Sequence, residues 1–218
     1  MSTRKSKDRA DPHADTARHG RAGEANEFST GMAITLGALC GLAWAAGFRA
    51  WMSELAGYAS RVDWMGTFGA ILLPGVIAGG LLGWAASIRA QGGRPGWRWL
   101  ALAPLPFAIL PLVRPGALES LLTNGLGGGA VAIPALAALG GFSISGRGWL
   151  WARIVCGVMA ILLVGGTVAA TPGIGGRRLA LTEPRGVWVA LIAASFLVLL
   201  VLAESIPFRA VAKAASRG

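Results

Sequence analysis

The sequence predicts an all-helical, polytopic transmembrane bundle of about six spans, one of them broken by proline. Of the 218 residues, 54% are apolar and 14% are charged, and the mean hydropathy is +0.59. Soluble domains of ordinary composition are much less apolar. The apolar residues are gathered into six runs, and most charged residues lie between these runs or in the N-terminal segment. This distribution is typical of a membrane protein with several spans.

The N-terminal segment, residues 1–30, differs in composition from the rest of the chain. It mixes charges of both signs with Gly, Pro and Ser, and Phe28 is its one large aromatic residue. Such a segment buries too little apolar surface to offset the entropy of ordering, so we expect a disordered cytoplasmic tail. This segment is too long and too polar to be the charged n-region of a signal peptide. The apolar run that follows is too long for the apolar h-region, so we expect no cleavage.

The predicted transmembrane domain covers residues 31–206 and is followed by a short basic cytoplasmic tail, residues 207–218. Most of its apolar runs reach the ~20 residues that a helix needs to cross ~30 Å of hydrocarbon. The runs cover residues 31–51, 67–88, 97–113, 121–143, 149–170 and 187–206.

The third run is short and contains Pro104, Pro106 and Pro111. Each proline removes a backbone donor and clashes with the preceding helical turn. We therefore expect a kinked, broken or re-entrant segment, whose freed carbonyls need partners from neighbouring helices or water.

The basic residues predict the orientation, because Lys and Arg are enriched in cytoplasmic loops. With six crossings, many more basic residues lie on one side of the membrane than on the other. This excess places both termini in the cytoplasm, and we expect the protein in the plasma membrane. The basic residues on the cytoplasmic side are then those of the tail, Arg89, Arg94, Arg98, Arg147, Arg153, Arg209, Lys213 and Arg217. Those on the outer side are Arg49, Arg61, Arg114, Arg177, Arg178 and Arg185.

The charge pattern leaves one alternative open. If the third run turns back, every later loop changes side and the bias is nearly as strong. We favour a full crossing because Trp97 and Trp99 begin the run and Arg114 follows it, and such residues are typical of membrane interfaces. Most of the nine tryptophans, Trp51 among them, lie at the ends of apolar runs, and we expect them to form an interfacial aromatic belt.

The high isoelectric point, about 11.4, would suggest nucleic-acid binding in a soluble protein. Here the basic residues lie at the ends of apolar runs, where they set the orientation of the spans. We therefore expect no nucleic-acid partner. The excess of Arg over Lys and the 33 glycines are typical of a gene of high GC content and favour a bacterial origin.

Small residues recur at four-residue steps in the first two runs. Gly75, Gly79 and Gly83 form one such stripe, and Gly37 and Gly41 begin another. A stripe without side chains lets two helix backbones approach closely in lipid. The stripes could form a dimerisation face or pack these two runs against each other. We favour packing within the chain, since several helices must pack there.

Four charged residues are candidates for the outer mouth of a solute site: Arg49, Glu54, Asp63 and Glu119. Ionisable groups at membrane depth often mark a solute pathway. Alternatively, Arg49 lies near the membrane interface, and these groups only form salt bridges that hold short loops together. The position of Arg49 near the end of an apolar run favours this second interpretation. Glu204, near Arg209, is open to the same explanation.

The sequence nominates no catalytic, cofactor or metal site. Both histidines, His13 and His19, lie in the segment 1–30, so the runs offer no histidine for haem, metal or a serine dyad. Cys40 and Cys156 lie in separate runs without a CxxC pattern, so we expect two buried thiols. No enzymatic activity is predicted, although a membrane enzyme acting on lipid stays a third hypothesis.

The leading hypothesis is therefore a non-enzymatic membrane protein that binds or transports a small solute. The third and fourth runs would form the site, with Arg49 at its outer mouth. The alternative is an accessory or scaffold subunit of a membrane or envelope complex, which needs only packing faces and a tail. The expected partners are the lipid bilayer, a small solute, and either another membrane protein or further copies of the chain.

Overall fold

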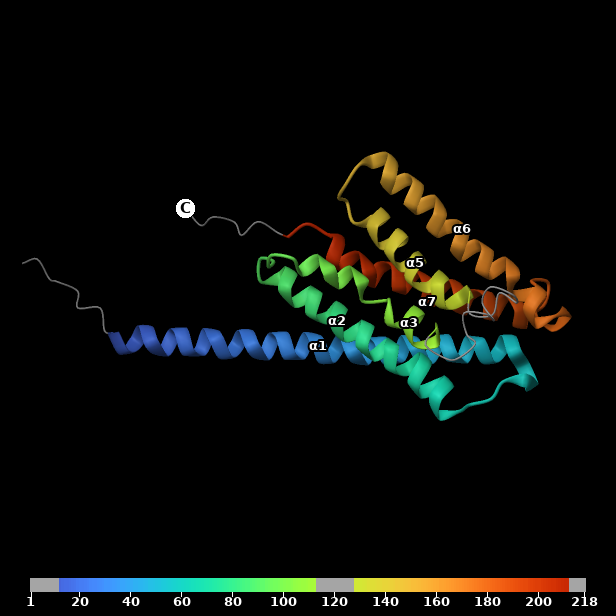
Figure 1. The fold of residues 1–218 in the computed structure, drawn as a ribbon, viewed down its shortest axis with the longest axis horizontal. Coiled ribbons are helices and arrows are strands. Elements are labelled where there is room, and N and C mark those ends of the chain that lie inside the picture. The colour runs from blue at the N-terminus through green and yellow to red at the C-terminus, as the bar shows by residue number, and fades with distance from the viewer. Residues whose placement is uncertain (1–11, 113–127, 212–218) are drawn as a thin grey trace, which may run out of the picture.

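The computed structural model describes residues 12–112 and 128–211, and every regular element in those residues is a helix (Figure 1). The bounds are α1 Pro12–Ala56, η1 Gly57–Ala59, η2 Trp64–Leu72, α2 Leu73–Ala90, η3 Trp97–Leu102, α3 Pro106–Leu112, α5 Gly128–Ile144, α6 Leu150–Gly175, η4 Arg177–Leu179 and α7 Pro184–Phe208.

The predicted membrane bundle is confirmed. Four helical segments of the described chain are long and apolar enough to cross a membrane: Thr30–Ala59, Trp64–Ala90, Leu150–Gly175 and Pro184–Phe208. A fifth apolar helix, Val131–Ile144, is shorter.

The third run is broken, as its prolines predict. It consists of the 3-10 helix η3, a turn at residues 103–105, and the short helix α3. At the start of α3, the Phe107 amide donates to the Pro104 carbonyl at 3.1 Å. A local hydrogen bond therefore satisfies a backbone carbonyl at the break. The segment begins beside the last turns of α2, where Trp97 packs in one cluster with Ala85 and Ile88, and it reaches α1 at Phe107, which packs edge-on against Trp44. Residues 113–127, including the end of this run, lie outside the described residues.

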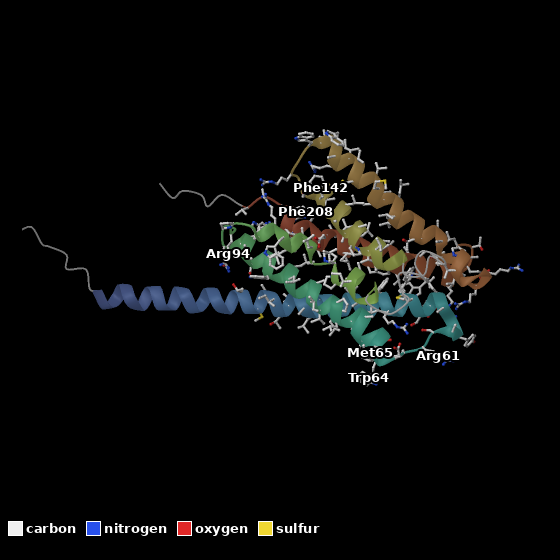
Figure 2. All side chains as sticks on the ribbon, viewed as in Figure 1. Arg61, Trp64, Met65, Arg94, Phe142 and Phe208 are labelled. Carbon is white, nitrogen blue, oxygen red and sulfur yellow. The ribbon has the colours of Figure 1, made fainter. Side chains whose placement is uncertain are left out.

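The helices lie roughly along one direction, so the bundle has two ends (Figures 1 and 2). At one end the Gln91 amide binds Thr30 and the rings of Phe142 and Phe208 meet. We call it the basic end because its described arginines are Arg89, Arg94, Arg98, Arg147, Arg153 and Arg209.

At the opposite end, Arg178 and Arg185 reach the last turns of α1. Its described charged residues are Arg49, Glu54, Arg61, Asp63, Arg177, Arg178, Glu183 and Arg185. The described arginines thus fall into the same two groups that a full crossing by the third run requires.

Helix α1 reaches further toward the N-terminus than the sequence suggests. Its backbone is helical from Pro12, although residues 1–30 were expected to lack ordered structure. The part before Thr30 projects past the ends of the other helices (Figure 1). Once the apolar part has nucleated a helix, adding each further residue costs little, and this segment holds Ala, Arg and Glu, which favour helix. Residues 1–11 and 212–218 lie outside the described residues.

A cluster of aromatic rings forms much of the core. Trp44, Phe48 and Trp51 of α1 meet Phe196 of α7 with ring centroids 5.4–5.8 Å from that ring. Trp51 was expected in the interfacial aromatic belt but is buried, and its indole nitrogen has no hydrogen-bond partner. Trp97 is buried as well. Other tryptophans suit the predicted belt, since they are exposed: Trp64, Trp99, Trp149, Trp151 and Trp188.

Candidate functional site

Arg49 lies at the end opposite the basic end and binds the connection that follows α1. Its Nη1 donates to the hydroxyls of Ser53 and Ser60, the latter at 3.2 Å. Its Nη2 donates to the carbonyl of Arg61. Its Nε donates to the Thr67 hydroxyl of η2 at 3.3 Å. The guanidinium therefore holds together the last turns of α1, the loop and the first turn of η2, using neutral acceptors throughout.

Glu54 and Asp63 also have partners close by. Glu54 forms an ion pair of 2.9 Å with Arg185, at the start of α7, and both side chains are well exposed. The neighbouring Arg178 donates to the carbonyls of Glu54 and Leu55 at 2.7 and 2.9 Å. Asp63 caps η2, because its carboxylate accepts from the Gly66 amide at 2.7 Å. Glu119 lies outside the described residues.

The structure thus places Arg49, Glu54 and Asp63 at one end but joins each to a different partner. No ion pair links Arg49 to a carboxylate in the described part of the chain. These contacts are of the kind expected of residues that hold short loops together. None of the three lines either of the two cavities described below.

We predict that Arg49→Ala lowers the free energy of unfolding by about 2 kcal/mol, because several charge-assisted hydrogen bonds across one loop are lost. Denaturant titration of the purified protein measures this change. Arg61→Ala is the matched control, since the backbone carbonyl of Arg61, not its side chain, binds Arg49. Equal stability of the two variants would show that Arg49 does not hold the loop.

The two small-residue stripes pack against each other within the chain. A Cβ built on Gly79 of α2 would lie 2.8 Å from the Gly41 Cα and would also meet the Gly37 carbonyl. A Cβ on Gly75 or Gly83 would collide with α1 in the same way. The backbones of α1 and α2 are therefore in direct contact, and these glycines are covered by their own chain.

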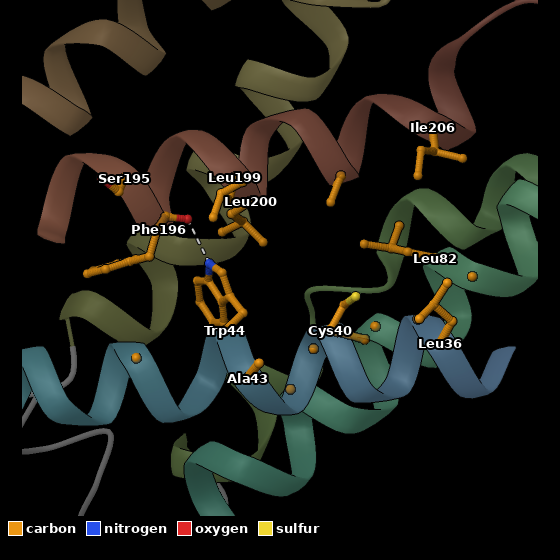
Figure 3. Close-up of a pocket in the computed structure, with 18 of the residues that line it drawn as sticks. Leu36, Cys40, Ala43, Trp44, Leu82, Ser195, Phe196, Leu199, Leu200 and Ile206 are labelled. Carbon is orange, nitrogen blue, oxygen red and sulfur yellow. Dashed lines mark hydrogen bonds between the residues drawn. The ribbon is translucent and has the colours of Figure 1, made fainter. Parts of the chain in front are cut away.

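A cavity of about 850 Å³ lies between α1, α2 and α7 (Figure 3). Along α1 it extends from Ala33 to Gly47, a distance of about 21 Å at 1.5 Å per residue. Trp44 and Phe196 lie toward one end of it, and Ile206 lies toward the other. The third run contributes Phe107.

The polar groups of this cavity are already bonded within the chain. The Trp44 indole donates to the Phe196 carbonyl at 2.7 Å, and the Ser195 hydroxyl donates to the Leu191 carbonyl at 2.7 Å. No charged residue lines it. Cys40, expected to be buried, is exposed and its side chain points from α1 toward α7 (Figure 3). An occupant of this space would therefore meet an almost entirely apolar wall.

Sequence reasoning also placed Glu204 wrongly. It was explained as an interfacial residue near Arg209, but its side chain is fully buried and neither carboxyl oxygen has a hydrogen-bond partner. It packs against Gly141 of α5, where an added Cβ would lie 3.0 Å from the Glu204 Cγ. The spacing offers a signal, because Ala193, Leu197 and Leu200 precede Glu204 on one buried stripe of α7.

Comparison with protein-family models, with curated proteins and with solved structures returns no match to this chain. The functional conclusion therefore depends on the geometry alone.

Proposed function

We propose that this membrane protein is non-enzymatic and binds a small, long-chain apolar solute in the cavity between α1, α2 and α7. The main support for this proposal is the cavity itself. Its volume of about 850 Å³ lies within the range of ligand sites, about 300–1,000 Å³. Its length of about 21 Å along α1 is more than half of the ~30 Å hydrocarbon core, which suits an extended chain.

The chemistry of the wall supports an apolar solute over a polar one. Placing a polar group against a wall with so few free hydrogen-bonding groups costs free energy. The Trp44 indole N–H and the Ser195 O–H are both donated to backbone carbonyls of α7, so neither offers a donor to a solute. The charged residues first considered for a mouth lie outside this cavity: Arg49 and Glu54 are in the last turns of α1, and Asp63 is in the loop that follows it.

The basic end is proposed to face the cytoplasm of a plasma membrane. Among residues 30–112 and 128–211, the only carboxylate near the six arginines of this end is that of Glu204, which is buried. The opposite end carries three described carboxylates, those of Glu54, Asp63 and Glu183. This asymmetry follows the positive-inside rule and supports a cytoplasmic position for both ends of the chain.

Cys40 permits a direct test of the proposal, because it lines the cavity whereas Cys156 lies outside both cavities. The purified protein is treated with N-ethylmaleimide while hexadecanol is titrated, and peptide mass spectrometry measures the alkylation of each thiol. Hexadecanol bound in the cavity would lie against Cys40 and shield its thiol, because a pocket encloses most of its ligand. We therefore expect alkylation of Cys40 to slow by at least about fivefold. Alkylation of Cys156 should not change. Equal slowing of both thiols would overturn the proposal.

Two matched glycine variants separate the cavity from the surrounding micelle. A Cβ at Gly47 meets no atom within 4 Å, and Gly47 lines the cavity, so Gly47→Leu fills the space without a clash. Gly31 is equally open but lies outside the cavity. Gly47→Leu should abolish the protection of Cys40 by hexadecanol, and Gly31→Leu should leave it intact. Protection that survives Gly47→Leu would place the solute elsewhere.

The N-terminal part of α1 favours the second candidate, an accessory or scaffold subunit. Before Thr30 this helix extends beyond the bundle, where it is accessible to another protein (Figure 1). This role needs no solute in the cavity. Unprotected Cys40 in the experiment above would therefore favour it over solute binding.

A further inference from the structure

A second cavity, of about 680 Å³, lies between α5, α6 and α7 and is independent of the first. Along α6 it extends from Leu150 past Arg153 to Gly165. Its wall is apolar along most of this length, with Ile154 and Ile161 on α6 and Val198 and Leu202 on α7. The segment from Arg153 to Gly165 measures about 18 Å, close to the thickness of one leaflet, about half of ~30 Å.

Arg153 gives this cavity a charged group at the basic end. Its Nε donates to the Ser143 carbonyl at 3.0 Å, which fixes the guanidinium against the end of α5. Its two Nη groups have no hydrogen-bond partner in residues 12–112 and 128–211. A guanidinium with its Nη groups free presents paired donors, the arrangement that binds phosphate oxygens in bidentate fashion.

The surroundings of Arg153 favour an anion at the membrane surface. Trp149 and Trp151, which precede it, are 73% and 62% exposed, as expected of side chains at headgroup level. Arg147 lies in the adjoining turn and is exposed. Among residues 30–112 and 128–211, no exposed carboxylate lies at this end of the bundle. The local charge is therefore positive beside an apolar cleft one leaflet deep.

We propose that this cleft binds an anionic phospholipid. The phosphate lies on the Nη groups of Arg153, and one acyl chain lies in the cleft from Ile154 to Gly165. Basic pockets between transmembrane helices are known to recognise anionic headgroups, and here the charge and the chain-length groove belong to one cavity. The site is separate from the proposed solute cavity, with which it shares no lining residue.

The test uses native mass spectrometry of the full-length protein titrated with phosphatidylglycerol or phosphatidylcholine. We expect tighter binding of phosphatidylglycerol, and Arg153→Gln should weaken it about tenfold by removing charge-assisted bonds worth at least about 1.4 kcal/mol. Arg61→Gln removes one exposed arginine at the opposite end and should have no effect. Equal losses in both variants would show only bulk attraction by net charge and overturn the site.

The acyl part of the proposal has its own matched pair. Gly165 and Gly166 are adjacent on α6, and a Cβ at either meets no atom within 4 Å. Only Gly165 lines the cleft, so Gly165→Leu should fill it and weaken phosphatidylglycerol binding, whereas Gly166→Leu should not. This pair also tests the proposal if Arg153→Gln fails to fold. Equal binding by the two glycine variants, or equal affinity for phosphatidylcholine, would overturn it. Gly47→Leu should leave this binding unchanged, which separates it from the solute cavity.

Discussion

Replacing Gly79 by alanine should lower the free energy of unfolding by about 1 to 3 kcal/mol, the usual cost of overpacking a closely packed interior. The new Cβ would lie 2.8 Å from the Gly41 Cα and 2.9 Å from the Gly41 nitrogen. These atoms belong to a helix backbone, so they cannot rotate away as a side chain could. Helices α1 and α2 must move apart, which loses van der Waals contact along both stripes. Denaturant titration of the purified protein measures the loss.

Gly80→Ala is the matched control for Gly79→Ala. The neighbouring glycine lies on the same helix, and its nearest contacts for a new Cβ are ordinary, with Ala38 Cβ and Ile34 Cγ2 both at 3.8 Å. Alanine there should stabilise the protein by about 0.5 to 1 kcal/mol through helix propensity. The two adjacent substitutions should therefore change stability in opposite directions. If Gly79→Ala instead altered only the oligomeric state, the stripe would serve dimerisation.

Replacing Glu204 by methionine should raise the free energy of unfolding by about 1 to 3 kcal/mol, the cost of burying a polar group without a partner. The side chain is fully buried, and both of its carboxyl oxygens lack hydrogen bonds. Methionine has a similar length and a flexible chain, so it can follow the same path beside Gly141 without a new polar atom. Thermal or chemical unfolding of the two proteins gives the difference.

Ser205→Ala provides the contrast for Glu204→Met. Ser205 is equally buried, but its hydroxyl donates to the Leu202 carbonyl at 2.7 Å. Losing that satisfied bond should leave stability unchanged or lower it by about 1 kcal/mol. Glu204→Gln should resemble the wild type, because an amide in the same place is just as poorly bonded. A less stable Glu204→Met protein would mean that the carboxyl has a partner in the folded state and would contradict its isolation.

The helical content and the break in the third run were predictable because they follow from local chemistry. Long apolar runs must satisfy their own backbone in lipid, which leaves helix as the only structure for a single segment. Pro104 and Pro106 break that helix whatever surrounds them. The N-terminal part of α1 was not predictable, because a polar segment gives no periodic signal, and the adjoining apolar helix can extend into it.

The partners of charged and aromatic side chains were much harder to predict. In a membrane helix the faces toward lipid and toward protein are both apolar, so the sequence does not show which residues are buried. Trp51 and Glu204 were both assigned to the interface because they lie near the ends of apolar runs. The structure turns both toward other helices, with Trp51 against Phe196 and Glu204 against Gly141.

The sequence by itself determined that this chain is an all-helical membrane bundle, that prolines break its third segment, and that small residues line one side of α1 and α2. Each of these follows from hydropathy, backbone donors or side-chain size, which are local properties. Only the tertiary structure decided that the glycine stripes meet each other, that Arg49 binds a loop, and that two apolar cavities flank α7. The physical reason is that lipid solvates every apolar face equally well, so helix contacts are selected by shape and by hydrogen bonds between distant residues.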